Sequence, residues 1–269
     1  MDWLEVHPGD APLVVAFPHT GTEIPAELEH QFVSPWLARR DTDWWIHRLY
    51  GFAQELGATT VRTRIGRSVI DVNRDPTGAS LYPGQATTEL CPTTTFDGQA
   101  LYARSLPDAA EIDRRCAAYF IPYHEALARE IGRLCELHGK VVLYDAHSIR
   151  SHIPRLFDGE LPNFNLGTNS GASCADTLTK AIEATCDASP YSRVTDGRFK
   201  GGWTTRRYGE PEAGVHAVQM ELACRSYMDE PQAPLGPDNW PSPYSEDRAT
   251  PVRAVLTDVL EACLAFARS

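Results

Sequence analysis

The 269-residue sequence predicts a single-domain α/β fold built around a mixed sheet. Short apolar runs, typical of buried strands, alternate with longer stretches of helical pattern, and this alternation indicates the α/β class. A chain of this length can bury one large core, and α/β proteins of this size are often one domain. Because no internal repeat or low-complexity tract interrupts the pattern, we expect one domain over residues 1–269.

The strands are the most regular part of this prediction. Leu13–Phe17 is a run of five apolar residues that Pro18 ends, and a second apolar run ends at His147. A later stretch alternates apolar and polar residues in part and carries Glu221 at its end. In chain order, we expect strands at 13–17, 59–63, 68–73, 140–148, 193–195 and 215–222.

Helical patterns fill much of the sequence between the strands. An amphipathic stretch at 44–53 has Asp41 or Asp43 as its candidate N-cap. The mostly helical region 107–138 contains Pro122, which interrupts a helix. Further helices are expected at 172–186 and 251–267.

Four segments lack such regularity. We expect a polar loop with a short helix at 24–37, a second loop at 151–170 and an exposed glycine-rich segment at 199–209. The stretch 77–98 is rich in proline, glycine and threonine and is too long for a passive connector in a compact domain. It is therefore a candidate lid.

Composition restricts the class of partner. A formal net charge of −11 without a Lys/Arg run argues against nucleic acid and anionic membranes, because both would repel this chain. The expected partner is a small molecule. The seven cysteines are scattered and form no C-x-x-C pair, which favours reduced thiols. Residues 1–5 resemble no leader, and no apolar run approaches the roughly 18 residues of a membrane span, so we expect a soluble cytoplasmic protein.

Two of the predicted strands deliver a histidine at their carboxyl ends, His19 and His147. Ligands of open α/β sheets bind in the crevice outside these ends, so the pair predicts a metal site. A catalytic zinc ion takes three protein ligands and keeps one position for water. For the third ligand, Glu23 lies four residues after His19, whereas Asp43 comes from a separate element, and spacing alone does not choose between them.

Seven short motifs are spread over nearly the whole chain. In order they are Pro18-His19-Thr20-Gly21, Asp41-Thr42-Asp43-Trp44, Arg67-Ser68-Val69-Ile70-Asp71-Val72-Asn73-Arg74, Tyr82-Pro83-Gly84-Gln85, Asp145-Ala146-His147-Ser148, Gly201-Gly202-Trp203-Thr204-Thr205-Arg206 and Gln219-Met220-Glu221-Leu222. With these motifs the chain resembles the N-formylglutamate amidohydrolase family of histidine degradation. More distantly, it resembles the aspartoacylase and zinc carboxypeptidase group.

The resemblance implies a three-layer α/β/α fold like that of zinc carboxypeptidases and phosphorylase/hydrolase-like proteins. It also implies zinc-dependent hydrolysis of N-formyl-L-glutamate to formate and L-glutamate, with one zinc ion per chain held by His19, Asp43 and His147. The distant relatives place their carboxylate ligand three residues after the first histidine, where this chain has Thr22. That ligand is therefore relocated here. N-formylaspartate and N-acetylaspartate are alternative substrates.

The remaining chemistry is assigned to one glutamate and several polar residues. Glu221 is expected to take a proton from the attacking water and to return it to the leaving amine. Because N-formylglutamate carries two carboxylates, arginines should bind it, and Arg67, Arg74 and Arg206 are the candidates. The resemblance matches Asn73 and Arg74 to a pair that holds a substrate carboxylate in the distant relatives. Arg67 could also polarise the scissile carbonyl.

Two other function classes compete with this one. A serine hydrolase using Ser148 beside His147 is disfavoured, because the sequence contains no Gly-x-Ser-x-Gly elbow. A protein that binds acidic amino acids through the arginines without a metal is the nonenzymatic alternative. Zinc content of the purified protein separates both from the amidohydrolase.

Overall fold

The computed structural model describes residues 2–81, 84, 86–232 and 234–269, so Tyr82, Pro83 and Gln85 of one predicted motif lie outside the described residues. The chain forms a seven-stranded sheet in the order β1-β3-β2-β4-β7-β5-β6. Two neighbouring pairs, β1 with β3 and β5 with β7, are antiparallel, and the others are parallel. The predicted mixed α/β sheet is therefore confirmed. The strands are β1 (Leu4–His7), β2 (Leu13–Phe17), β3 (Thr59–Thr63), β4 (Val141–Ile149), β5 (Phe164–Gly167), β6 (Arg193–Thr195) and β7 (Val215–Ala223).

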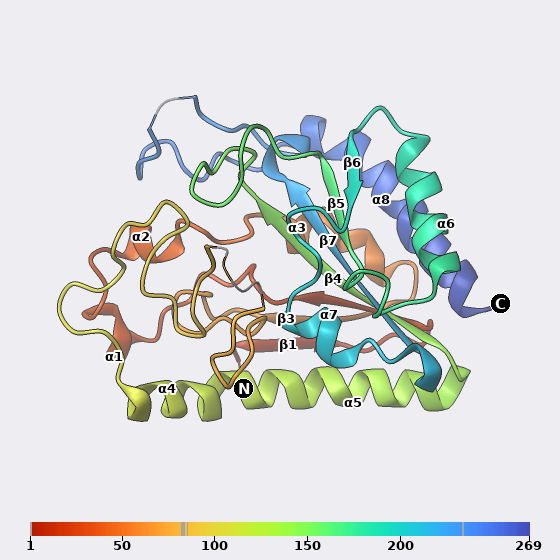
Figure 1. Cartoon of the computed structure of the whole chain (residues 1–269), viewed down its shortest axis with the longest axis horizontal. Helices are drawn as coiled ribbons and strands as arrows, with labels where there is room; N and C mark the ends of the chain where they lie inside the picture. Colours follow the sequence, from red (N-terminus) through yellow and green to blue (C-terminus); the bar gives the residue numbers. More distant parts are fainter. Residues whose placement is uncertain (1, 82–83, 85, 233) are drawn as a thin grey trace.

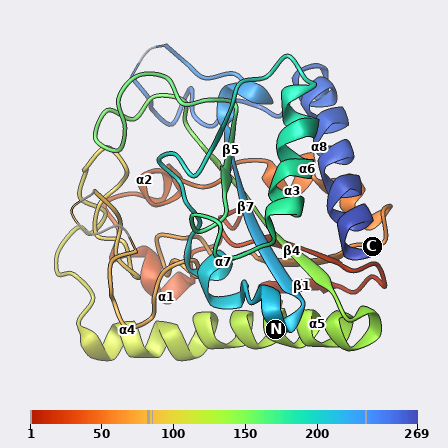
Figure 2. The ribbon, with the colours of Figure 1, turned by 45° about the vertical axis from the view of Figure 1, so that its right-hand side comes forward.

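Helices cover both faces of the sheet (Figures 1 and 2). The long helix α5 (Ile121–His138) lies along one face, and α6 (Asp176–Asp187) and α8 (Glu246–Ala267) pack side by side on the other. Successive strand side chains point to opposite faces, so Leu143 of β4 packs in the core on the α5 side and Tyr144 in the core with α6 and α8. The result is the predicted three-layer arrangement. None of the described helices has the length and apolar character that crossing a membrane requires.

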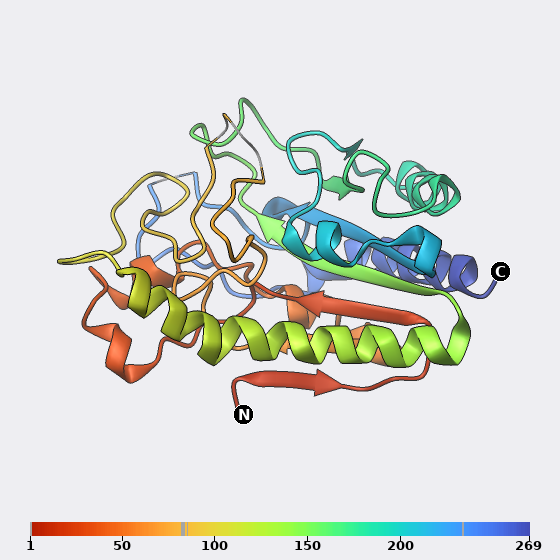
Figure 3. The same ribbon diagram turned by 60° about the horizontal axis from the view of Figure 1, so that its bottom comes forward.

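The parallel strands β2, β4 and β7 position the site. They are adjacent in the sheet, with β4 in the middle. Figure 3 shows β2 and β4 pointing toward the side of the molecule where long irregular segments gather. Because parallel strands end at the same edge of a sheet, side chains at their carboxyl ends are brought together there.

One predicted strand is wrong, and two strands were not predicted. Residues 68–73 form turns, and the N–H of Val69 donates to the carbonyl of Gly66 at 2.9 Å. The apolar side chains of this segment are nevertheless buried. The apolar pattern therefore indicated burial correctly, but it did not indicate pairing with another strand. The unpredicted strands β1 and β5 are each four residues long, and β5 lies within the expected loop 151–170.

The helix predicted at 44–53 is shorter than expected. It divides into α3 (Ile46–Leu49) and a 3-10 turn, Gly51–Gln54. Capping by Asp41 or Asp43 was wrong, since the N-cap residue is Trp45, in a left-handed conformation with φ 66°, and no side chain caps this end. Both carboxylates are therefore available for tertiary contacts.

The other helices shift at their ends. The region 107–138 holds α4 (Ala109–Arg115), a π-helical turn at 116–120 and then α5, whose first turn accommodates Pro122. α6 begins at 176, four residues later than expected. α8 begins five residues before 251, because Ser245 caps it by accepting the N–H of Arg248.

The short helix expected within 24–37 is present, and the glycine-rich segment at 199–209 also contains a helix. Within 24–37 the structure has α1 (Ala26–Glu29) and the start of α2 (Pro35–Arg39). Within 199–209 it has α7 (Trp203–Tyr208), in which Thr204 and Thr205 are buried. The prediction of an exposed segment at 199–209 was therefore wrong for this helix, because α7 packs against β7 and β4.

Candidate active site

The two histidines predicted from the strand ends lie side by side. His19 follows β2 and His147 belongs to β4, and their ring centroids are 4.7 Å apart. In the parallel register of β4 and β7, Glu221 is opposite His147 and Gln219 is opposite Asp145. All five side chains are buried. The sheet itself thus sets the spacing between the second histidine and the predicted base.

Asp43 completes a group of three possible metal ligands with His19 and His147, whose ligand atoms all lie within 4.8 Å of one another. Its Oδ2 is 3.0 Å from Nδ1 of His147 and 3.7 Å from Nδ1 of His19. The Asp43 N–H donates to the His19 carbonyl at 3.0 Å, which anchors its loop beside β2. Glu23 instead pairs with Arg64 and is 41% exposed. The structure therefore places Asp43, and not Glu23, beside the histidines.

Each imidazole also contacts a second carboxylate, through its Nε2 atom. Nε2 of His19 lies 2.6 Å from Oδ1 of Asp71, and Nε2 of His147 lies 3.0 Å from Oδ2 of Asp145. Both rings consequently turn Nδ1 toward Asp43. Nδ1 of His19 is buried and has no hydrogen-bond partner among the described residues. Two imidazole nitrogens and a carboxylate oxygen, each imidazole oriented by an outer carboxylate, are a donor set that fits a divalent cation such as zinc.

The charges of this group are set by burial and by its neighbours. Burial acts to raise the pKa of Asp43, but the imidazoles of His19 and His147 hold that pKa below its usual range. Burial also raises the pKa of Glu221, to about 8, against the opposing charge of His147. In the metal-free protein, Asp43 is therefore ionised at neutral pH while Glu221 keeps its proton. A cation held beside Glu221 favours its carboxylate form.

A cavity open to solvent adjoins this group. Its lining includes His19, His147 and Glu221 at the metal-ligand side and the predicted residues Arg67, Asn73 and Arg74. Arg67 and Arg74 therefore both line the cavity. Part of the 77–98 segment forms another wall, with residues Ala86 to Thr88 and Phe96. The described part of this segment has neither helix nor strand, as expected for a loop over a site.

The polar residues between the metal-ligand group and the cavity are braced by other side chains. Arg67 donates to Oδ2 of Asp71 at 2.7 Å, and its guanidinium lies over the ring of Phe96 at 4.9 Å. Asn73 donates to Oδ2 of Asp145 at 3.0 Å. Arg74 donates to the carbonyl of Thr88 at 3.1 Å. Arg67 and Asn73 are thus tied to the two outer carboxylates, and Arg74 is tied to the loop.

Comparison with known proteins identifies the family. The sequence model of the N-formylglutamate amidohydrolase family matches residues 11–228. The chain belongs to this family. It is 48% identical to an N-formylglutamate deformylase of Pseudomonas aeruginosa over 262 residues, which covers 97% of this chain and 95% of that one. It is 45% identical to an N-formylglutamate deformylase of Pseudomonas putida over 265 residues, covering 98% and 96%.

Solved structures show the same fold. An N-formylglutamate amidohydrolase from Ralstonia eutropha superposes with a TM-score of 0.76 at 24% identity, covering 99% of this chain and 97% of that one. A gene product from Agrobacterium tumefaciens gives a TM-score of 0.75 at 16% identity, covering 99% and 96%. At these identities the likeness establishes the fold alone.

The arginines that line the cavity differ in part from those predicted to bind substrate. Arg206, on α7, donates to the carbonyl of Gly201 at 3.0 Å and is not among the described residues that line the cavity. Arg198, in the loop after β6, does line it. No motif marked Arg198 in the sequence, because it reaches the cavity through the tertiary path of its loop. An Arg followed by an aromatic residue, Phe199, before the glycine pair was the only available signal.

Proposed function

We propose that this protein is a zinc-dependent N-formylglutamate deformylase, which hydrolyses N-formyl-L-glutamate to formate and L-glutamate in histidine degradation. The observation that carries the proposal is the convergence of His19, Asp43 and His147 beside Glu221 in an arginine-lined cavity. Two relatives that match nearly the full chain at 45% and 48% identity bear this activity in their names.

The chain supplies both the ligands for the metal and the group that transfers protons. His19, Asp43 and His147 would hold a zinc ion, which when bound would supply Lewis acidity and lower the pKa of a water molecule toward neutrality. Glu221 takes the proton of the attacking water and delivers it to the nitrogen of glutamate as the C–N bond breaks. Gln219 orients Glu221, because its Nε2 donates to Oε2 at 3.2 Å.

The arginines account for the substrate's charge. In a protein with a net charge of −11, a dianion enters only where local cations offset the repulsion. Arg67, fixed against Asp71, stabilises the oxyanion that forms at the formyl carbon. Arg74, with Asn73 beside it at the cavity wall, binds a carboxylate of the substrate.

A formate-release assay tests the proposal. The purified protein is assayed for formate release with N-formylglutamate, N-formylaspartate and N-formylalanine, and for release of free aspartate with N-acetylaspartate, before and after chelation and again after zinc is restored. We expect N-formylglutamate to be the best substrate, activity to disappear on chelation and zinc to restore it, with about one equivalent bound. Preference for another of these substrates would correct the acyl amino acid. Tight binding of the diacid without any turnover would instead support the metal-free binding protein.

A further inference from the structure

We propose that Asn73 is a positioning residue that holds His147 in the orientation needed to bind a metal ion, an inference that rests on the zinc site of the proposed function. From the sequence, Asn73 is expected to hold a substrate carboxylate together with Arg74. In the structure the two neighbours have different surroundings. Asn73 is only 2% exposed and its side chain donates to Asp145, whereas Arg74 donates to the 77–98 loop.

Three polar atoms meet beside the His147 ring. Nδ2 of Asn73 and Nε2 of His147 each lie 3.0 Å from Oδ2 of Asp145, and the two nitrogens are 2.9 Å apart. When His147 binds a cation through Nδ1, its Nε2 carries the hydrogen and donates it to Asp145. The same carboxylate oxygen therefore accepts one N–H from the metal ligand and one from Asn73.

Asp145 depends on the Asn73 side chain more than the other outer carboxylate, Asp71, does. Oδ1 of Asp145 is buried and has no hydrogen-bond partner among the described residues. Asp71, by contrast, accepts hydrogen bonds from Arg67 at 2.7 Å and from the backbone N–H of Asn73 at 2.9 Å. Loss of the Asn73 amide therefore leaves Asp71 supported, but it frees Asp145 to turn away from its imidazole.

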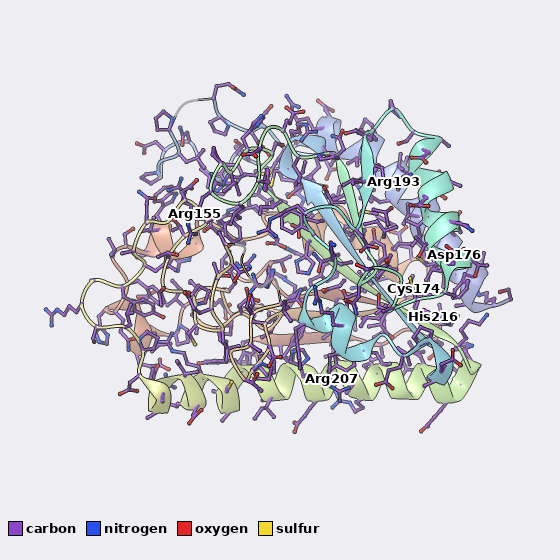
Figure 4. All side chains as sticks on the ribbon, viewed as in Figure 1. Arg155, Cys174, Asp176, Arg193, Arg207 and His216 are labelled. Carbon is purple, nitrogen blue, oxygen red and sulfur yellow. The ribbon has the colours of Figure 1, made fainter. Side chains whose placement is uncertain are left out.

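The other end of the Asn73 amide is fixed by α7. Its Oδ1 accepts the N–H of Thr204 at 2.8 Å. A side chain at Gly202 would collide with this amide, because an added Cβ would lie 2.5 Å from its Nδ2. α7 is bonded in turn to α5 through Tyr208, whose hydroxyl donates to a backbone carbonyl of that helix at 3.1 Å, and Figure 4 shows the preceding residue, Arg207, next to α5. Turning the amide toward a substrate would therefore break its bonds to α7 and to Asp145.

The test measures zinc affinity directly, by competition with a chromogenic chelator and without substrate. For Asn73→Ala we expect the dissociation constant for zinc to rise about 10- to 100-fold, as is typical when a partner of a metal-binding imidazole is lost. At saturating zinc, kcat for N-formylglutamate should fall while KM changes little, because Arg74 is intact. Arg74→Ala should show the opposite division, with a raised KM and a smaller change in zinc affinity.

Asn163 provides a matched control. Its Nδ2 donates to the hydroxyl of Ser226 at 3.0 Å, and its Oδ1 accepts the hydroxyl of Ser192 at 2.9 Å. None of these three residues is among the described residues that line the cavity. Asn163→Ala therefore removes a comparable pair of asparagine hydrogen bonds away from the metal-ligand group, and its zinc affinity should match that of the wild type.

A double variant tests whether Asn73 acts through Asp145. Asp145→Ala should weaken zinc binding at least as much as Asn73→Ala, and combining the two should cost less than about threefold more, because the shared contact is already lost. If Asn73→Ala does not fold, Asn73→Ser carries the comparison, because its hydroxyl ends one bond short of the amide atoms. Additive losses, or an unchanged zinc affinity with a raised KM, would overturn the positioning role while the wild-type activity stands. A wild type that binds no zinc would instead overturn the proposed function, and the positioning role with it.

Discussion

Glu221→Gln separates proton transfer from metal and substrate binding. The substitution keeps the volume of a side chain that is only 7% exposed, and the new amide oxygen can still accept the hydrogen bond from Gln219. The ligand group of His19, Asp43 and His147 does not include this residue. The fold and the bound zinc should therefore persist while the base is lost.

The expected loss follows from what the carboxylate does. General acid–base catalysis contributes on the order of 10² to 10⁴ in rate, and Glu221 is assigned both the uptake and the delivery of the proton. The drop in kcat should therefore lie at the upper end of that range or above it. Affinity for N-formylglutamate should change little, because the arginines that bind the carboxylates are intact.

Three measurements on one preparation test this reasoning. Metal analysis gives zinc content, calorimetry gives the affinity for N-formylglutamate, and single-turnover kinetics give the chemical rate. The reference variant is Gln219→Ala, which leaves the carboxylate in place and removes its orienting hydrogen bond, together with the bond that Gln219 accepts from the N–H of Gly202, so it should lose less activity. Loss of zinc from Glu221→Gln would make Glu221 a ligand. Turnover within tenfold of the wild type would remove it from the mechanism.

The remaining predictions concern metal, substrate and pH. His147→Ala should lose zinc and activity yet keep its circular dichroism spectrum, since apolar neighbours hold β4. Asp43→Ala should lower zinc occupancy more than Glu23→Ala, and the reverse order would make Glu23 the third ligand. Arg74→Ala should raise KM for N-formylglutamate alone if it binds the side-chain carboxylate, and for N-formylalanine as well if it binds the α-carboxylate. Because the pKa of Glu221 is raised to about 8, its contribution to metal-free stability is complete at low pH and is lost as pH rises through 8. In the metal-free state, the free energy of unfolding of Glu221→Gln should therefore rise relative to that of the wild type as the pH increases from 5 to 9, by on the order of a few kcal/mol. Denaturation of both proteins at each pH measures this difference.

Prediction from the sequence was most accurate for the features that depend on a local pattern of residues. Five of the six predicted strands are present, because each combines an apolar run with a clear end. The failures share a cause. Residues 68–73 and strand β5 are both short and buried, and burial alone does not say whether neighbouring backbone groups bond to a turn or to a second strand. Capping by Asp43 failed similarly, because a carboxylate before a helix satisfies the cap pattern whatever its tertiary partner is.

The support of the two histidines shows where local reasoning ends. In β4, Asp145 and His147 are two residues apart, so the strand period places both on one face and the carboxylate can reach Nε2. That relation is readable in the sequence. His19 receives the same support from Asp71, which is 52 residues away on a turn that the sequence presented as a strand. The turn is what aims Asp71 at His19, since its Oδ1 also accepts the N–H of Asn73 at 2.9 Å. A strand at this position would have alternated these side chains across a sheet, so the error in secondary structure and the missed partner of His19 have one physical origin.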